Sequence, residues 1–191
     1  MPAVHARRRS SVRILTYVAA AGLAFQLVHF TEHVAQLGYW FIHPELPPWL
    51  TPWALAGRGL LSDAPLVGNE LLHLVGNNIF LTGLIALKVI SLASGGAHAG
   101  RANLTKALWI QGFHVLEHLL LTFTLLLLGE ASGFSTLFGA LSNATLWTYR
   151  VWWHFAINLF ATVYATRAAK AMYDEGLVLS GPMRRTAIPQ I

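Results

Sequence analysis

The sequence predicts an all-α integral membrane protein, a four-helix bundle built from two duplicated helical hairpins. Three observations lead to this fold class. Of the 191 residues, 55% are hydrophobic and only 11% are charged, which is outside the usual range for a soluble domain. The apolar residues gather in four long stretches, and a polar motif in the first stretch returns in the third. We therefore treat residues 1–191 as a single membrane domain.

The four apolar stretches are predicted to be transmembrane helices. Each is close to or longer than the roughly 20 residues that a helix needs to cross about 30 Å of hydrocarbon. A soluble protein can bury an apolar helix, but four of them in so short a chain leave too little polar sequence to surround them. The predicted spans are residues 12–37, 66–92, 107–128 and 147–168.

The first stretch begins like a secretory signal peptide, since a basic segment precedes an apolar one. Its apolar run continues to about Leu37, however, which is longer than an ordinary signal core, and it contains half of the repeated motif. We therefore expect it to be retained as the first span. The chain contains no cysteine, which excludes disulfides and thiolate metal sites.

The basic residues of the loops predict how the spans are oriented. They concentrate in the N-terminal tail, in the loop between the second and third spans, and after the fourth span, whereas the other two loops are poor in them. By the positive-inside rule both termini are cytoplasmic, as an even number of spans also requires. We expect a multi-pass protein of the cell membrane, in contact with the lipid bilayer. The net charge of +5 is explained by this topology, so we expect no nucleic acid partner.

The two loops expected on the outer side differ in composition. The first is long and rich in Pro and Trp, and aromatic rings of this kind favour the membrane interface. Within it, residues 52–61, PWALAGRGLL, can form a short helix lying on the membrane. The second contains Gly and Ser. Together the two loops can cover the outer end of the bundle.

A polar series, Gln-x-x-His-x-x-Glu-His, runs from Gln26 to His33 and again from Gln111 to His118. After each copy comes a span that opens with His-x-x-x-Asn. This order is explained by a duplicated two-helix hairpin, with residues 1–94 and 95–170 as the two halves. Because two spans separate the copies, the halves share one orientation and are related by an axis along the membrane normal.

Each copy of the motif places its polar side chains on one face of a helix, because a helix advances 100° per residue. Ionisable residues are costly in the hydrocarbon core, so their repetition indicates a functional site. All four spans bring their polar residues to the outer half of the membrane. The residues predicted to bind metal are His29, Glu32, His33, His73, His114, Glu117, His118 and His154.

This set of ligands suits two divalent metal ions, each held by three histidines, with the two motif glutamates between them. One ion would take both histidines of the first motif, the other both histidines of the second, and each would add a histidine from span two or four. Glu70 is a further candidate, although Val151 stands at its place in the second half. The side chains expected to orient the ligand histidines are Gln26, Asn77, Gln111 and Asn158.

The leading functional interpretation is a membrane oxidoreductase with a dinuclear site near a lipid-accessible cavity. Iron is favoured over copper or zinc, because buried histidine and carboxylate ligands suit oxygen chemistry. A small apolar substrate or a redox partner is expected, and so short a chain can be one subunit of a larger membrane complex. The pattern does not single out catalytic residues.

Three alternatives stay open. The first is a copper or zinc protein that receives, stores or passes its ion without catalysis. Residues 113–121, FHVLEHLLL, resemble the His-rich helices of membrane copper-handling proteins, although the chain has only three methionines. The second is a b-type cytochrome with histidine pairs holding haem, and here the motif carboxylate would lie where a porphyrin face should be. The third is a packing role, in which polar residues join helices through hydrogen bonds of about 0.6–2 kcal/mol each.

Overall fold

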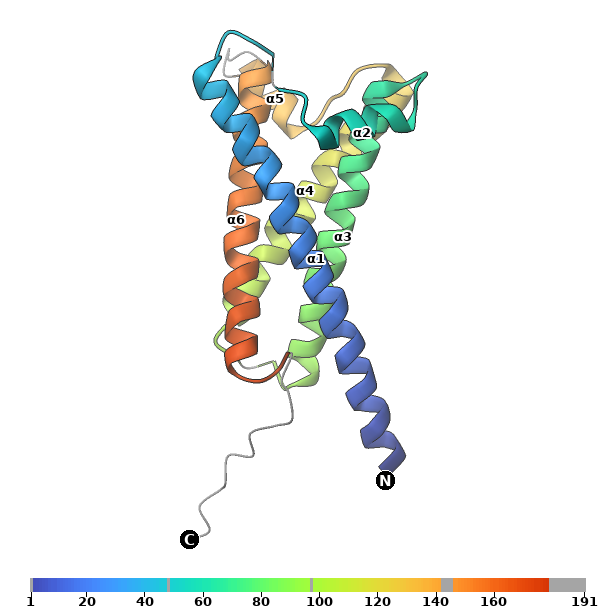
Figure 1. Ribbon diagram of the computed structural model, residues 1–191, viewed down its shortest axis with the longest axis vertical. Coiled ribbons are helices and arrows are strands. Elements are labelled where there is room, and N and C mark those ends of the chain that lie inside the picture. The colour runs from blue at the N-terminus through green and yellow to red at the C-terminus, as the bar shows by residue number, and fades with distance from the viewer. Residues whose placement is uncertain (1, 48, 97, 142–145, 179–191) are drawn as a thin grey trace.

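The computed structural model describes the backbone of residues 2–47, 49–96, 98–141 and 146–178, and the side chains of residues 10–47, 49–96, 98–138 and 150–178. Within these ranges all regular structure is helical, which confirms the predicted all-α class. Four helices are long and two are short (Figure 1). In chain order they are α1 (Pro2–Ile42), α2 (Pro52–Leu60), α3 (Pro65–Ala93), α4 (Arg101–Leu128), α5 (Phe134–Leu141) and α6 (Leu146–Asp174).

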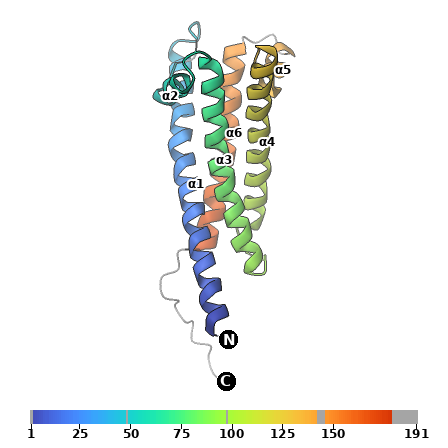
Figure 2. The ribbon, with the colours of Figure 1, turned by 90° about the vertical axis from the view of Figure 1, so that its right-hand side faces the viewer.

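The four long helices lie side by side, and both short helices lie at the same end of the molecule (Figures 1 and 2). We call this end, formed by α2 and α5, the capped end. α1 packs against α3 and α6, and α4 packs against the same two helices. The long helices therefore surround one common interior. The N-terminus of α1 lies at the end opposite to the capped end (Figure 1).

Three helical segments are long and apolar enough to cross a membrane: Ser10–Ile42, Pro65–Ala93 and Arg101–Leu128. They contain the first three predicted spans, and they fit a multi-pass membrane protein in contact with lipid. The fourth predicted span lies within α6, which is as long as α3. It also carries Arg150, His154, Arg167 and Lys170, which lower its hydropathy. Three candidate spans are thus established by length and composition.

Local sequence signals mark several helix ends. Pro52 and Pro65 begin α2 and α3. The first N–H groups of a helix have no acceptor within it, so the missing N–H of proline costs no hydrogen bond there. Gly129 ends α4 in the left-handed conformation, with a φ of 76° that favours glycine. The short helix expected within residues 52–61 forms as α2.

The interior is divided into an apolar half and a polar half. Away from the capped end, large apolar side chains such as Phe80, Leu84 and Ile90 are almost completely buried. There α4 and α6 contribute small buried residues, including Ala107 and Ala161, which let two helix backbones approach closely. Nearer the capped end, the buried side chains of the four long helices are mainly glutamine, asparagine, histidine and glutamate.

Gly22 lies where α1 crosses α3, and a Cβ atom at this position would be only 2.8 Å from the Cα of Gly83. We expect Gly22→Ala to lower the free energy of unfolding by about 1–3 kcal/mol, because the helices must move apart. Thermal unfolding in detergent, followed by circular dichroism, measures this loss. Gly38→Ala is the matched control in the same helix, since a Cβ atom there meets nothing within 4 Å. Equal destabilisation by both substitutions would contradict a close crossing at Gly22.

Candidate metal centre

Two amide pairs separate the apolar half of the interior from the polar half. Gln26 of α1 donates a hydrogen bond to Asn158 of α6, and Gln111 of α4 donates one to Asn77 of α3, both at 2.9 Å. In each pair the glutamine and the asparagine come from different halves of the sequence repeat. Each asparagine also donates to the backbone carbonyl of the histidine one turn earlier in its helix. The amides therefore join the helices directly beside the histidines.

Six histidines fill the polar half of the interior, and we call them the histidine cluster. They come from all four long helices, and each is at most 8% exposed. Neighbouring imidazole rings have centroids 4.7–5.9 Å apart. The fold thus brings together all the histidines that the sequence singles out. They are His29 and His33 of α1, His73 of α3, His114 and His118 of α4, and His154 of α6.

The Nδ1 atoms of five of these histidines face an oxygen atom. His73 and His154 each donate from Nδ1 to the backbone carbonyl four residues earlier, at 2.8 Å. The other three Nδ1 atoms face side-chain oxygens. These contacts are His33 with Gln36 at 3.2 Å, His118 with Glu70 at 3.1 Å, and His29 with Glu32 at 3.3 Å.

Carbonyl and carboxylate oxygens accept hydrogen bonds, so the Nδ1 atoms of His33, His73, His118 and His154 carry the hydrogen and their Nε2 atoms keep a lone pair. Histidines that bind metal are commonly held in this way. Nδ1 of His29 lies near Glu32 but makes no hydrogen bond within the described residues. Within the described residues, the buried Nε2 atoms of His118 and His154 have no hydrogen-bond partner, and neither ring nitrogen of His114 has one. A buried polar atom left unpaired costs about 1–3 kcal/mol. Their gathering at one place indicates a group that binds them together.

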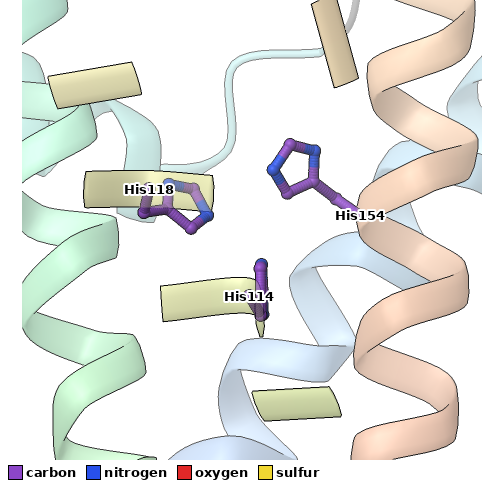
Figure 3. Close-up of side chains that lie close together, drawn as sticks. All are labelled: His114, His118 and His154. Carbon is purple, nitrogen blue, oxygen red and sulfur yellow. The ribbon is translucent and has the colours of Figure 1, made fainter. Parts of the chain in front are cut away.

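His114, His118 and His154, which we call the second group because they belong to the second hairpin, could hold a metal ion. One nitrogen from each ring lies within 4.8 Å of the others, and the three rings face a common space between α4 and α6 (Figure 3). Nitrogens that share one ion at about 2.0–2.1 Å lie roughly 3.3 Å apart in a tetrahedral site. Small ring rotations would therefore be enough to form such a site.

His29, His33 and His73 of the first hairpin lie between α1 and α3, and we call them the first group. The Nε2 atoms of His29 and His33 are 3.2 Å apart, and the ring centroids of His29 and His73 are 5.5 Å apart. Two nitrogen lone pairs at this distance repel each other unless a proton or a metal cation lies between them. One ring can supply that proton as a hydrogen bond to the other, and among the described residues only the group of His114, His118 and His154 has one nitrogen per ring within 4.8 Å of the others.

Glu32 lies beside the first group. Its carboxylate is 3.3 Å from Nδ1 of His29 and 4.0 Å from Nε2 of His73, and it accepts a hydrogen bond from the hydroxyl of Thr51. Thr51 is also the N-cap of α2, because its hydroxyl accepts from the backbone N–H of Ala54. Glu32 thus connects the histidines to one of the two short helices.

Glu117, the equivalent residue of the second motif, faces α5. Its carboxylate accepts hydrogen bonds from the backbone N–H groups of Phe134, at 2.7 Å, and Ser135, at 2.9 Å, and from the Ser135 hydroxyl at 2.5 Å. A carboxylate is favoured at a helix N-terminus by the exposed N–H groups there. Both oxygens of Glu117 are engaged in this way, an arrangement that differs from the expected position between two metal ions.

A family model matches the chain over almost its whole length, from residue 3 to residue 186. The chain belongs to the DUF6008 family. This family is described as one of unknown function. The chain matches no curated protein and no solved structure. The function of this DUF6008 protein is therefore argued from the residues of its site.

Glu70 and Arg150 form an ion pair that the predicted site did not contain. Glu70 accepts from Nη2 of Arg150 at 2.7 Å and from Nδ1 of His118 at 3.1 Å. At these two positions the halves of the repeat differ, since Val151 corresponds to Glu70 and Asn69 to Arg150. From the sequence, Glu70 is a candidate metal ligand, and Arg150 is either an interface anchor at the start of its span or an anion-binding residue. Their shared departure from the repeat is the signal that could have identified the pair.

Proposed function

We propose that this protein is a multi-pass protein of the cell membrane, a bundle of two related hairpins whose histidine cluster binds two transition metal ions. In this proposal α6 is the fourth span, the capped end is the outer end, and both termini are cytoplasmic. The observation that carries the proposal is the common orientation of the imidazoles. Four Nδ1 atoms make hydrogen bonds to oxygens, which leaves the Nε2 atoms of these histidines for a shared ligand.

Each hairpin supplies the three histidines of one ion, and nearby residues orient them. Glu32 accompanies the first group, whereas Glu70 reaches the second group from the opposite hairpin and holds His118 by its Nδ1 atom. Gln26, Asn77, Gln111 and Asn158 support the helices beside the histidines. The proposed ligands are His29, His33 and His73 for the first ion and His114, His118 and His154 for the second.

The donor atoms fit a first-row transition metal, because imidazole nitrogens and carboxylate oxygens are available and the chain has no cysteine. Iron is favoured over copper, since cuprous copper more often brings sulfur ligands, and over zinc, which has no redox chemistry. Bound iron would supply electron transfer or oxygen chemistry. We therefore propose an oxidoreductase that acts on a small molecule or exchanges electrons with a partner, alone or within a larger membrane complex.

Two other interpretations fit the geometry less well. A b-type haem needs a broad flat slot between its axial histidines, and six rings with centroids 4.7–5.9 Å apart leave little room for one. A packing role accounts for the two amide pairs, which join helices through hydrogen bonds. It does not account for imidazole nitrogens that lack a partner within the described residues.

One observation favours a second candidate, a copper or zinc protein that binds or transfers its ion without catalysis. The carboxylates nearest to the second group are turned away from its Nε2 atoms, since Glu70 faces Nδ1 of His118 and Glu117 faces α5. A group of three imidazoles, namely His114, His118 and His154, suits zinc or copper as well as iron. The identity of the bound metal separates the two candidates.

The proposal is tested by purifying the protein in mild detergent and measuring its metal content and absorption spectrum. We expect about two iron ions per chain and no Soret band, with content unchanged in the control His43→Ala, whose histidine is not buried and lies outside the cluster. Copper or zinc in place of iron would support the second candidate. A Soret band would identify haem. Protein that contains no metal and takes up none on reconstitution would contradict both proposals.

A further inference from the structure

A cavity of about 350 Å³ lies directly against the histidine cluster. One wall is formed by His33, His73, His118 and His154, so the cavity reaches histidines of both groups. Residues of α2 and of the segment before it line another part, and Glu70 and Arg150 border it as well. Its volume is near the lower end of the range of about 300–1,000 Å³ for small-molecule sites. The cavity is thus placed where a small ligand would meet the metal-binding atoms.

Arg58 of α2 also lines this cavity. Its Nε atom is buried and, in the part of the chain that the structure describes, has no hydrogen-bond partner. Among the described residues that line the cavity, Glu70 is the only acid, and it is already paired with Arg150 and His118. The two arginines therefore outnumber the acid, and one positive charge faces the cavity unbalanced.

Close packing of α2 on α3 fixes the place of this arginine. Gly57 of α2 lies so near α3 that a Cβ atom there would be 2.8 Å from the Cα of Asn69. The neighbouring Arg58 is held over the cavity by this contact. α2 is held at its other end too, because Thr51 caps the helix and donates to Glu32. The guanidinium is thus attached to a helix that is fixed at both ends.

We propose that the cavity binds a small organic acid, whose carboxylate is held by Arg58 and by the N–H groups of Arg150 that Glu70 does not use. Guanidinium groups hold carboxylates well because their N–H groups match the two oxygens. Trp49, Leu50 and Val151 also line the cavity and provide an apolar surface for the rest of the molecule. An inorganic anion would leave this surface unused, and a long-chain fatty acid exceeds the volume. As an assignment of the substrate class, this inference rests on the proposed function, whereas binding of the acid itself depends only on the cavity.

Binding is tested by calorimetry on purified protein, with benzoate as the probe and benzamide as its neutral match. We expect benzoate to bind at least about tenfold more tightly than benzamide, since hydrogen bonds between two charged groups are stronger than those to a neutral amide. Arg58→Gln should weaken benzoate at least about tenfold without changing benzamide, and Arg58→Lys should have a smaller effect. Arg101→Gln, which changes an exposed arginine at the other end of the helices, should have none.

Val151→Phe fills the cavity from α6 and should abolish binding of both probes, which tests the site without altering charge. Equal affinity of wild type and Arg58→Gln for benzoate would overturn the inference. So would phospholipid that copurifies with wild type but not with Arg58→Gln and that benzoate cannot displace, because the anion would then be a lipid headgroup. Metal content is measured on the same samples. If the protein binds benzoate but cannot take up metal, the proposed function is contradicted and this inference is not. If it binds metal but not benzoate, this inference is contradicted and the proposed function is not.

Discussion

Replacing His118 and His154 together by alanine is expected to remove one metal ion from each chain and to leave the other bound. These two histidines belong to the group between α4 and α6, and both have a buried Nε2 atom without a hydrogen-bond partner within the described residues. After the double substitution only His114 of that group remains, and one imidazole does not hold an ion. The single ion of the first group keeps all its ligands, because His29, His33 and His73 are unchanged.

The reciprocal variant replaces His29 and His73, and it should remove the ion of the first group while sparing the second. Metal content per chain, measured by mass spectrometry, should fall from about two to about one in both variants. The spectrum should differ between them, because Glu32 lies beside only the first group. A double substitution of His43 and His98, which lie outside the cluster, is the control. If each cluster variant lost all metal, the six histidines would form one shared site, and the assignment of one ion to each hairpin would be wrong.

The positions of the histidines could be predicted because helix geometry converts sequence spacing into a common face. His29 and His33 are one turn apart and must point the same way, and so must His114 and His118. The amides one turn from the histidines, Gln before them in α1 and α4 and Asn after them in α3 and α6, follow by the same rule, although their exact partners do not. That Gln26 pairs with Asn158, across the two halves of the repeat, depends on which helices are neighbours. Spacing within one helix carries no information about its neighbours.

The role of the motif glutamates could not be predicted, because it depends on how the loops fold back. Glu32 accepts a hydrogen bond from Thr51 at the start of α2, and Glu117 accepts three at the start of α5. Both residues therefore hold a short helix over the capped end. Loop docking of this kind leaves no periodic signal in the sequence. That either glutamate binds metal stays a prediction, and the structural feature that the two copies share is a hydrogen bond at the start of a short helix.

The two glutamates nevertheless have different surroundings, because Glu32 lies next to histidines of the cluster and Glu117 faces α5. Glu32 also faces Nδ1 of His29 and lies 4.0 Å from Nε2 of His73. The carboxylate of Glu117 makes its close contacts with Phe134 and Ser135. A change at Glu32 should therefore affect both the short helix and the metal, whereas a change at Glu117 should affect mainly the short helix. The roles of Glu32 and Glu117 can therefore be distinguished by experiment, although the two residues occupy the same place in the repeated motif.

Glu117→Ala is expected to lower the free energy of unfolding by about 3 kcal/mol or more. The side chain is fully buried, and its removal leaves two backbone N–H groups and a hydroxyl without their acceptor, each costing about 1–3 kcal/mol if it stays buried. The loop packs closely on this carboxylate, since a Cβ atom at Gly133 would lie 3.0 Å from either oxygen of Glu117, so the substitution also leaves an empty space. Thermal unfolding in detergent gives the loss of stability. Limited proteolysis between α4 and α5 should show that α5 detaches first.

Metal content distinguishes a structural role of Glu117 from a role as ligand. We expect Glu117→Ala to keep about two ions per chain, because the histidine groups remain intact. Glu117→Gln should lose less stability than alanine, since its amide oxygen still accepts hydrogen bonds, whereas Glu130→Ala, an exposed acid beyond the end of α4, should change neither quantity. Loss of one ion from a Glu117→Gln protein that unfolds at the wild-type temperature would assign the carboxylate to the metal. α5 would then have to move away from Glu117 whenever the metal binds, and the short helix would be part of the site and not only its cover.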